Sequence, residues 1–192
     1  TYNNHKPVQF MFEDALRADA KKTIDKFKKS GIEVAILSGD RHQTVKDVAD
    51  QLQIKNWQAN CSPQDKLKAV KQHQAAGKTV FVIGDGSNDA PALAAADISM
   101  SPGSASDVSQ LSADLIFQSQ SLFAAYRVWQ VSKLSRKLIK QNIGLAIGYN
   151  AIAVPIAIFG FATPFIAAIA MSTSSMIVTL NALRLRLKEK SL

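Results

Sequence analysis

Cysteine is nearly absent from this chain of 192 residues, which contains only Cys61. A single thiol excludes an intrachain disulfide and a metal site built from cysteines alone, and it fits a reducing compartment. Histidine is also scarce, and His5, His42 and His73 lie apart in polar surroundings. We therefore interpret the histidines as solvated surface residues and Cys61 as a structural residue.

Acidic residues are almost missing from the last third of the chain. Residues 1–120 carry 14 basic and 14 acidic side chains, whereas residues 121–192 carry 9 basic and 1 acidic, which accounts for the net charge of +8. These bases flank 43 residues, 141–183, that carry no charge. A basic chain can indicate nucleic-acid binding. Here the charge borders apolar segments of membrane length, so we expect membrane flanks and no nucleic-acid partner.

The uncharged stretch is long enough for two membrane crossings of about 20 residues each. Gly160 and Pro164 interrupt it, which predicts helices over 143–161 and 165–183 with a short turn between them. The alternative is a buried helical hairpin of a soluble protein, in which so long an uncharged stretch would be unusual. Because bases flank both ends and the turn has none, both chain ends are expected to be cytoplasmic.

The first part of the chain alternates apolar runs with amphipathic segments. This alternation predicts an α/β fold with a parallel sheet and helices on both faces. A basic amphipathic helix over 121–142 follows and leads into the membrane, and a basic tail closes the chain at 184–192. The predicted strands cover 8–12, 32–37, 79–83, 98–100 and 115–117, and the predicted helices cover 19–30, 41–52, 63–76 and 90–96.

The most informative motif is IGDGSNDAPALAAAD at residues 83–97. Asp85 follows an apolar strand, at the carboxyl end where open α/β sheets bind ligands. Asp85 and Asp89 lie four residues apart across a glycine turn and can share a hard cation such as Mg²⁺. The alternative is an Asp-Gly turn in which Asp89 caps a helix.

The string GDGSNDAPAL resembles the GDGxNDAPAL signature of P-type ATPases, which belong to the haloacid dehalogenase-like superfamily. The resemblance implies that Asp85 binds Mg²⁺ and that Asn88 and Asp89 order the phosphorylation site. Ser87 stands where the family usually has Val or Ile, a change that we expect to be tolerated. On this resemblance, residues 1–120 are the C-terminal portion of the phosphorylation domain.

Two further segments fit the same site. Ser38-Gly39-Asp40 follows a predicted strand, and its hydroxyl and backbone N–H groups could hold a phosphoryl oxygen, although an ordinary turn is the alternative. It resembles the TGD motif of the family, and we expect it beside Asp85 on one sheet edge. Lys66 lies one turn into a helix, where most lysines are solvated. It resembles the lysine of the PxxK element, which implies that it neutralises the phosphoryl group.

Several parts of the family are missing from the sequence. It contains no DKTGT motif, whose aspartate is the phosphorylated nucleophile, and no Cys-Pro-Cys membrane helix. The resemblance covers the C-terminal part of an ATPase and implies Mg²⁺ and ATP as cofactors, with the nucleotide domain outside this chain. We expect the chain alone to be inactive as an ATPase. A membrane-anchored phosphatase of the superfamily, or a non-catalytic module that binds an ATPase, are the rival interpretations.

Polar groups within the uncharged stretch are candidates for an ion path. Tyr149 and Asn150 lie in the first predicted span, and Met171 and Ser175 share a face of the second. A thioether suits Cu(I), but polar packing between helices explains the same residues from physics alone.

The strings GYN and MSTSS resemble those of copper(I)-translocating P-type ATPases, notably the copper exporters that supply cytochrome oxidase assembly in bacteria. The resemblance implies Cu⁺ as the transported ion, the bacterial cytoplasmic membrane as the location, and the lipid bilayer, the remainder of the ATPase and a copper chaperone as candidate partners. A P-type ATPase for another metal, such as zinc, is the alternative.

Overall fold

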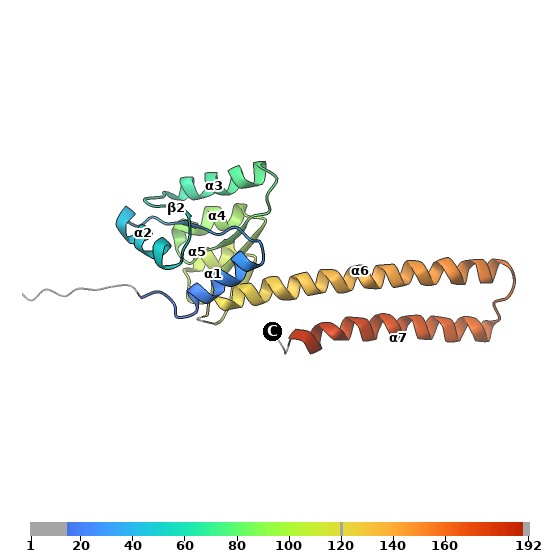
Figure 1. Ribbon diagram of the computed structural model, residues 1–192. Coiled ribbons are helices and arrows are strands. Elements are labelled where there is room, and N and C mark those ends of the chain that lie inside the picture. Colours follow the sequence, from blue (N-terminus) through green and yellow to red (C-terminus); the bar gives the residue numbers. More distant parts are fainter. Residues whose placement is uncertain (1–14, 120, 190–192) are drawn as a thin grey trace, which may run out of the picture. The chain divides into compact units, whose positions relative to one another are not determined.

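The computed structural model describes residues 15–119 and 121–189 (Figure 1). The chain divides after Ala124 into two compact units, and each is considered by itself below. The strand expected over 8–12 lies outside the described residues.

The first unit alternates short strands and helices, as the sequence predicts. Its strands are all parallel where they pair: β1 with β2, and β3 with β4, which in turn pairs with β5. The helices α2, α4 and α5 contact these strands. The elements are α1 (Ala20–Lys29), β1 (Ala35–Leu37), α2 (His42–Gln51), β2 (Asn56–Gln58), α3 (Pro63–Ala75), β3 (Phe81–Ile83), the 3₁₀ turn η1 (Ser87–Asp89), α4 (Ala90–Ala95), β4 (Ile98–Pro102), α5 (Asp107–Ser112) and β5 (Leu115–Phe117).

The helix ends follow the capping residues in the sequence. Gly31 and Gly77 adopt φ angles of +79° and +77° directly after α1 and α3, a conformation that glycine tolerates best. At the start of α3, the Ser62 hydroxyl accepts from the Asp65 N–H at 3.2 Å, and the Asp65 carboxylate accepts from the Ser62 N–H at 2.9 Å. This reciprocal capping box positions the helix that carries Lys66.

The observed elements differ from the expected ones in three ways. Among the described residues, the strands form two ladders, β1–β2 and β3–β4–β5, where one sheet was expected. In addition, β2 and α5 were not predicted. Their sequences, Asn-Trp-Gln and Asp-Val-Ser-Gln-Leu-Ser, are largely polar, so hydrophobic periodicity gives no signal for them. The observed strands β1 and β3 are also shorter than predicted, at three residues each.

One hydrophobic cluster of the first unit joins α1 to the segment after α2, while other buried side chains, such as Leu93 and Met100, lie on α4 and β4. Ala20 and Ile24 of α1 are buried with Leu52 and Ile54. Partly buried side chains pack against this cluster, namely Val34, Ile36, Val48 and Leu122. Leu122 comes from the far end of the unit, so residues about a hundred positions apart in sequence share one core.

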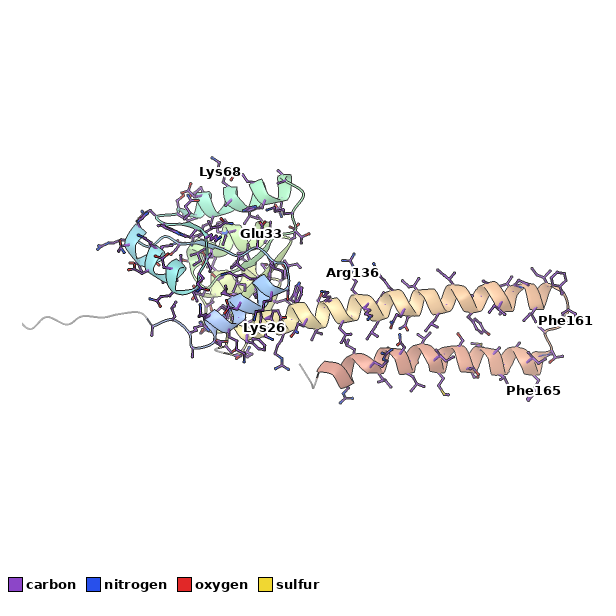
Figure 2. The ribbon with its side chains drawn as sticks, in the orientation of Figure 1. Lys26, Glu33, Lys68, Arg136, Phe161 and Phe165 are labelled. Atoms are coloured by element: carbon purple, nitrogen blue, oxygen red, sulfur yellow. The ribbon has the colours of Figure 1, made fainter. Side chains whose placement is uncertain are left out.

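The second unit is a helical hairpin. Helix α6 (Phe123–Ile158) begins just before the unit boundary, and α7 (Pro164–Glu189) runs beside it in the opposite direction (Figure 1). Gly160, at φ +79°, follows α6, and the Thr163 hydroxyl accepts from the Ile166 N–H at 3.3 Å to cap α7. Both helices are long and apolar enough to cross a membrane. Phe161 and Phe165 lie at the turn and are 72% and 73% exposed (Figure 2).

The connecting helix predicted over 121–142 and the span predicted from 143 are parts of one helix in the structure. This helix, α6, runs without interruption for 36 residues, and Gly144, Gly148 and Pro155 lie inside it without ending it. Helix α7 likewise extends beyond the predicted end at 183, to Glu189.

Cys61 is buried, with 6% of its surface exposed, and its thiol contacts the carbonyl of Gln58 at 3.4 Å. Burial raises the pKa of the Cys61 thiol above its ordinary value of 9.0. The thiolate, which is the reactive form, is therefore scarce near neutral pH.

We expect Cys61 in the native chain to react slowly with a maleimide near neutral pH and quickly once the chain is unfolded in guanidinium. Because its pKa is raised, the native rate should increase as the pH rises toward that pKa. Labelling followed by mass spectrometry measures both rates. Equal rates in native and unfolded chain would show that Cys61 is not part of the packed interior.

Candidate functional site

A short ion pair organises the loop after β3. The Lys66 ammonium of α3 lies 2.6 Å from Asp89 Oδ1 of η1, and the two side chains are only 12% and 18% exposed. The second oxygen of Asp89, Oδ2, accepts from the Gly86 N–H at 3.2 Å. Both oxygens of the carboxylate therefore have a donor, and the pair joins α3 to the loop.

Gly84 lets this carboxylate approach the backbone. A Cβ atom at Gly84 would lie 2.7 Å from the Asp89 Cβ, which is closer than real side chains come. A Cβ at Gly86 would meet Asp89 Oδ2 at 3.6 Å, which is an ordinary contact. The motif therefore needs its first glycine for space, whereas the second is sterically replaceable.

Asp85 occupies a different environment from Asp89. Its side chain is exposed and, among the residues that the structure describes, takes part in no hydrogen bond or ion pair. Its backbone carbonyl accepts from the Ser106 N–H at 3.2 Å, which fixes the backbone beneath the free carboxylate. Asn88 and Ser87 are also exposed. The loop thus carries one fully engaged carboxylate and one available carboxylate.

Helix α5 holds the backbone of the loop after β3 through a hydrogen bond, a role that the sequence did not predict. The Ser109 hydroxyl donates to the Gly86 carbonyl at 2.5 Å, and Ser109 is completely buried. Ser106 caps α5 by accepting from the Ser109 N–H at 3.3 Å. Serines in a polar segment carry no signal for such a role, because the same residues are common in solvated loops.

The segment Ser38-Gly39-Asp40 forms a closed turn after β1. The Ser38 hydroxyl donates to Asp40 Oδ2 at 2.7 Å, and the Asp40 N–H donates to the Ser38 hydroxyl at 3.2 Å. The Cys61 N–H donates to the Ser38 carbonyl at 2.9 Å, just before α3 begins.

The expectation that this segment and Asp85 share one sheet edge is wrong for the described residues, because β1 and β3 belong to different ladders. Within the part of the chain that the structure describes, each of these short strands pairs along one side only, β1 with β2 and β3 with β4. The start of α3 links the Ser38–Asp40 turn to the loop after β3, although the two segments do not share a sheet. The Cys61 N–H, just before α3, donates to the Ser38 carbonyl, and the Lys66 ammonium of α3 donates to Asp89.

The donor set of this loop suits a hard cation but is incomplete. Asp85 offers carboxylate oxygens, the ligands that Mg²⁺ prefers. Within residues 15–119 and 121–189, no three His, Cys, Asp or Glu side chains gather as a metal site. A cation at Asp85 therefore needs further oxygen ligands from water or from another part of the protein.

The hairpin contains a groove of about 710 Å³ between α6 and α7. Tyr149 lines it, as do the small residues Gly144 and Gly148. Across the groove stands Ser174, and not Ser175, which is exposed. Of the residues predicted for the ion path, only Tyr149 thus lies between the two helices.

The other predicted path residues point elsewhere. Asn150 is exposed and its amide donates back to the Ala146 carbonyl at 3.0 Å, while Met171 is 73% exposed. A polar cluster that was not predicted bridges the two helices near their charged ends. Asn181 donates to Asn142 Oδ1 at 2.8 Å and accepts from the Arg184 guanidinium at 3.0 Å.

A family model described as haloacid dehalogenase-like hydrolase matches residues 2–97. The chain belongs to this hydrolase family. Proteins that are similar to it along most of its length include P-type ATPases. The nitrogen fixation protein FixI of Rhizobium meliloti is 47% identical over 177 residues, which cover 92% of this chain and 23% of the relative. A copper-exporting P-type ATPase of Bacillus subtilis is 38% identical over 173 residues, with 90% and 22% covered.

A solved structure is similar to the chain over parts of both units. A zinc-transporting PIB-type ATPase in its E2·Pi state matches with a TM-score of 0.84 and 32% identity over 90% of this chain and 28% of that one. The chain spans about a quarter of the length of the relatives that it matches. The expected fold, a haloacid dehalogenase-like domain followed by two long apolar helices, is confirmed.

We expect Gly84→Ala to destabilise the first unit by about 1–3 kcal/mol, because the new methyl group must displace Asp89 from Lys66. Gly86→Ala is the matched control and should change stability far less. Thermal unfolding of both variants in detergent, followed by circular dichroism, measures the difference. Equal destabilisation by the two substitutions would contradict the close approach of Asp89 to Gly84.

Proposed function

We propose that this chain is part of an ATP-driven copper(I) transporter. Its first unit supplies the magnesium-binding half of the phosphorylation site, and its hairpin supplies part of the membrane ion path. The observation that carries the proposal is the loop after β3, in which Lys66 engages Asp89 while the neighbouring Asp85 stays free. The relationship to P-type ATPases, including a copper exporter, supports it.

We propose that each side chain of the candidate site has its own role in phosphoryl transfer. Asp85 would hold Mg²⁺, which neutralises charge on phosphoryl oxygens when bound. Lys66 is held in place by Asp89 and brings a positive charge to the same edge. The Ser38 turn adds backbone N–H groups that can face a phosphoryl oxygen, and its hydroxyl can donate to that oxygen once it leaves Asp40. Asn88 and Asp40 complete the proposed set.

The nucleophilic aspartate must come from elsewhere, because the sequence contains no DKTGT motif. The one-sided pairing of β1 and β3 leaves strand edges for a further segment, and unpaired edges are favourable places for a strand to add. We propose that the segment carrying the aspartate adds there, next to the Asp85 loop. ATP would be bound by a domain outside this chain.

The proposed layout in the membrane follows the charges. Residues 1–120 belong to the phosphorylation domain, 121–142 connect it to the bilayer, 143–183 cross twice, and 184–192 form a basic tail. Both ends of this layout lie in the cytoplasm of a bacterium, because the bases flank the spans and the turn has none. The bilayer and the remainder of the ATPase are the immediate partners, and a copper chaperone is a candidate donor.

The proposed copper path uses the donors of both helices. Tyr149 lies in the groove between α6 and α7, whereas Met171, Asn150 and Ser175 are exposed and can face other helices of the complete protein. A thioether is a soft ligand and favours Cu(I). Zinc transport is the second candidate, because the matched structure is of a zinc-transporting enzyme.

In the complete protein, Asp85→Asn should abolish the phosphoenzyme formed from ATP, because it removes the only free carboxylate of the loop. Ser87→Val, at an exposed neighbouring position, should be nearly silent. Labelling with γ-³²P-ATP followed by acid quench measures both. Near-normal phosphoenzyme in Asp85→Asn would refute the magnesium assignment.

Met171→Ala and Asn150→Ala should each lower Cu(I)-stimulated ATP hydrolysis of the complete protein more than Ile169→Ala, a neighbour that is also exposed but has no donor atom. Zn²⁺ should stimulate poorly, since the hairpin has no Cys, His, Asp or Glu between 141 and 183. Turnover with Cu(I), Ag(I) and Zn²⁺ decides the ion. Equal stimulation by Zn²⁺, or full activity of Met171→Ala, would favour the zinc alternative or a packing role.

A further inference from the structure

Asp19 lies directly before α1 and is a residue type that often caps helices, yet its side chain caps a different helix. It directly precedes α1, but its carboxylate makes no capping bond to that helix. Instead, Asp19 Oδ2 accepts from the Phe123 N–H at 2.8 Å and from the Ser121 hydroxyl. These partners lie more than a hundred residues later in the chain.

Phe123 is the first residue of α6, so Asp19 caps the long helix from outside. The first N–H groups of a helix have no partner within it, and a negative charge at this end is favourable for the helix dipole. Burial raises the pKa of Asp19, but the hydrogen bonds from Ser121 and Phe123 outweigh burial and hold it below the ordinary 3.8. The carboxylate is therefore ionised at neutral pH.

Apolar and cationic contacts reinforce this junction. Leu122 packs against the core cluster of Ala20, Ile24, Leu52 and Ile54. The Lys22 ammonium lies 5.5 Å from the centre of the Phe123 ring. We call the set of Asp19, Lys22, Ser121, Leu122 and Phe123 the α1–α6 clasp. All of its residues belong to the first unit.

Hydrogen bonds and the course of the chain link the clasp to the candidate site. On α1, the Lys28 ammonium donates to the carbonyls of Leu52 and Gln53 at 3.1 and 2.6 Å, at the end of α2. Helix α2 begins at His42, directly after the Ser38–Asp40 turn. A change in that turn can reach Asp19 through two packed helices, and such a contiguous network is one physical route for coupling.

We propose that Asp19 is a positioning residue that couples the phosphorylation site to the membrane helix α6. This inference rests on the proposed function, because it concerns how ATP hydrolysis drives ion movement. Asp19 touches neither the phosphoryl site nor the ion path. Its loss should therefore separate the two activities, leaving phosphorylation and reducing the number of ions moved for each ATP.

The test uses the complete ATPase reconstituted in vesicles, with phosphoenzyme, ATP hydrolysis and ion uptake measured together. For Asp19→Ala we expect phosphoenzyme close to that of wild type and ions per ATP lowered by up to about fivefold, because the loss of one helix cap shifts the equilibrium that holds the start of α6 by about that factor. Asp25→Ala is the matched control on the same helix and should keep both values. Asp19→Asn, which keeps an acceptor oxygen without the charge, should fall between.

Ser121→Ala leaves the bond from the Phe123 N–H to Asp19 in place. It is therefore the milder variant, for use if Asp19→Ala does not fold. It should reduce ions per ATP in the same direction, and adding it to Asp19→Ala should cause little further loss, because both remove one interaction. Wild-type stoichiometry in the Asp19 and Ser121 variants would overturn the proposal. So would a parallel loss of phosphoenzyme and uptake.

If the proposed function is wrong, the wild-type enzyme itself shows it, whatever the variants do. Without phosphoenzyme that depends on the ion, the wild type is not an ion-driven ATPase and Asp19 has nothing to couple. If Zn²⁺ and not Cu(I) stimulates the wild-type enzyme, the number of ions moved for each ATP is measured with Zn²⁺ instead. The choice of metal therefore does not decide the role of Asp19.

Discussion

The ion pair between Lys66 and Asp89 determines the form of the candidate site. It requires the missing side chain of Gly84, the capping box that starts α3, and the support that Ser109 gives to the loop. A largely shielded charge is tolerable only when it is paired and hydrogen-bonded, and Asp89 meets both conditions. Because Asp89 is fully engaged, Asp85 is left as the carboxylate that can take a ligand.

Local signals predicted the helix boundaries well. Gly31 and Gly77 mark the ends of α1 and α3, and Ser62 with Pro63 marks the start of α3, because each depends on a few adjacent residues. The same approach missed β2 and α5, whose residues are mostly polar. It also placed Ser38–Asp40 and Asp85 on one sheet, whereas their strands belong to different ladders among the described residues. Strand pairing depends on distant partners that local patterns do not identify.

The motifs predicted the residue types of the site but not which way each side chain points. In the hairpin, Ser174 lines the groove and Ser175 does not, although they are adjacent. One residue turns a helix by about 100°, so an error of one position changes the face. Asp19 is a further example: a helix was predicted over 19–30, but nothing nearby indicates that the carboxylate of Asp19 accepts from the Phe123 N–H.

Helix α6 has a mechanical consequence that follows from its length alone. Its first 18 residues, Phe123–Lys140, precede the uncharged stretch and measure roughly 27 Å at 1.5 Å per residue. They contain no proline and no glycine, so this part behaves as a stiff rod. A tilt of roughly 10° at Phe123 displaces its other end by roughly 5 Å, about one helical turn. A small tilt of the helix at Phe123 is thus enlarged along the helix before it reaches Gln141, where the uncharged stretch begins.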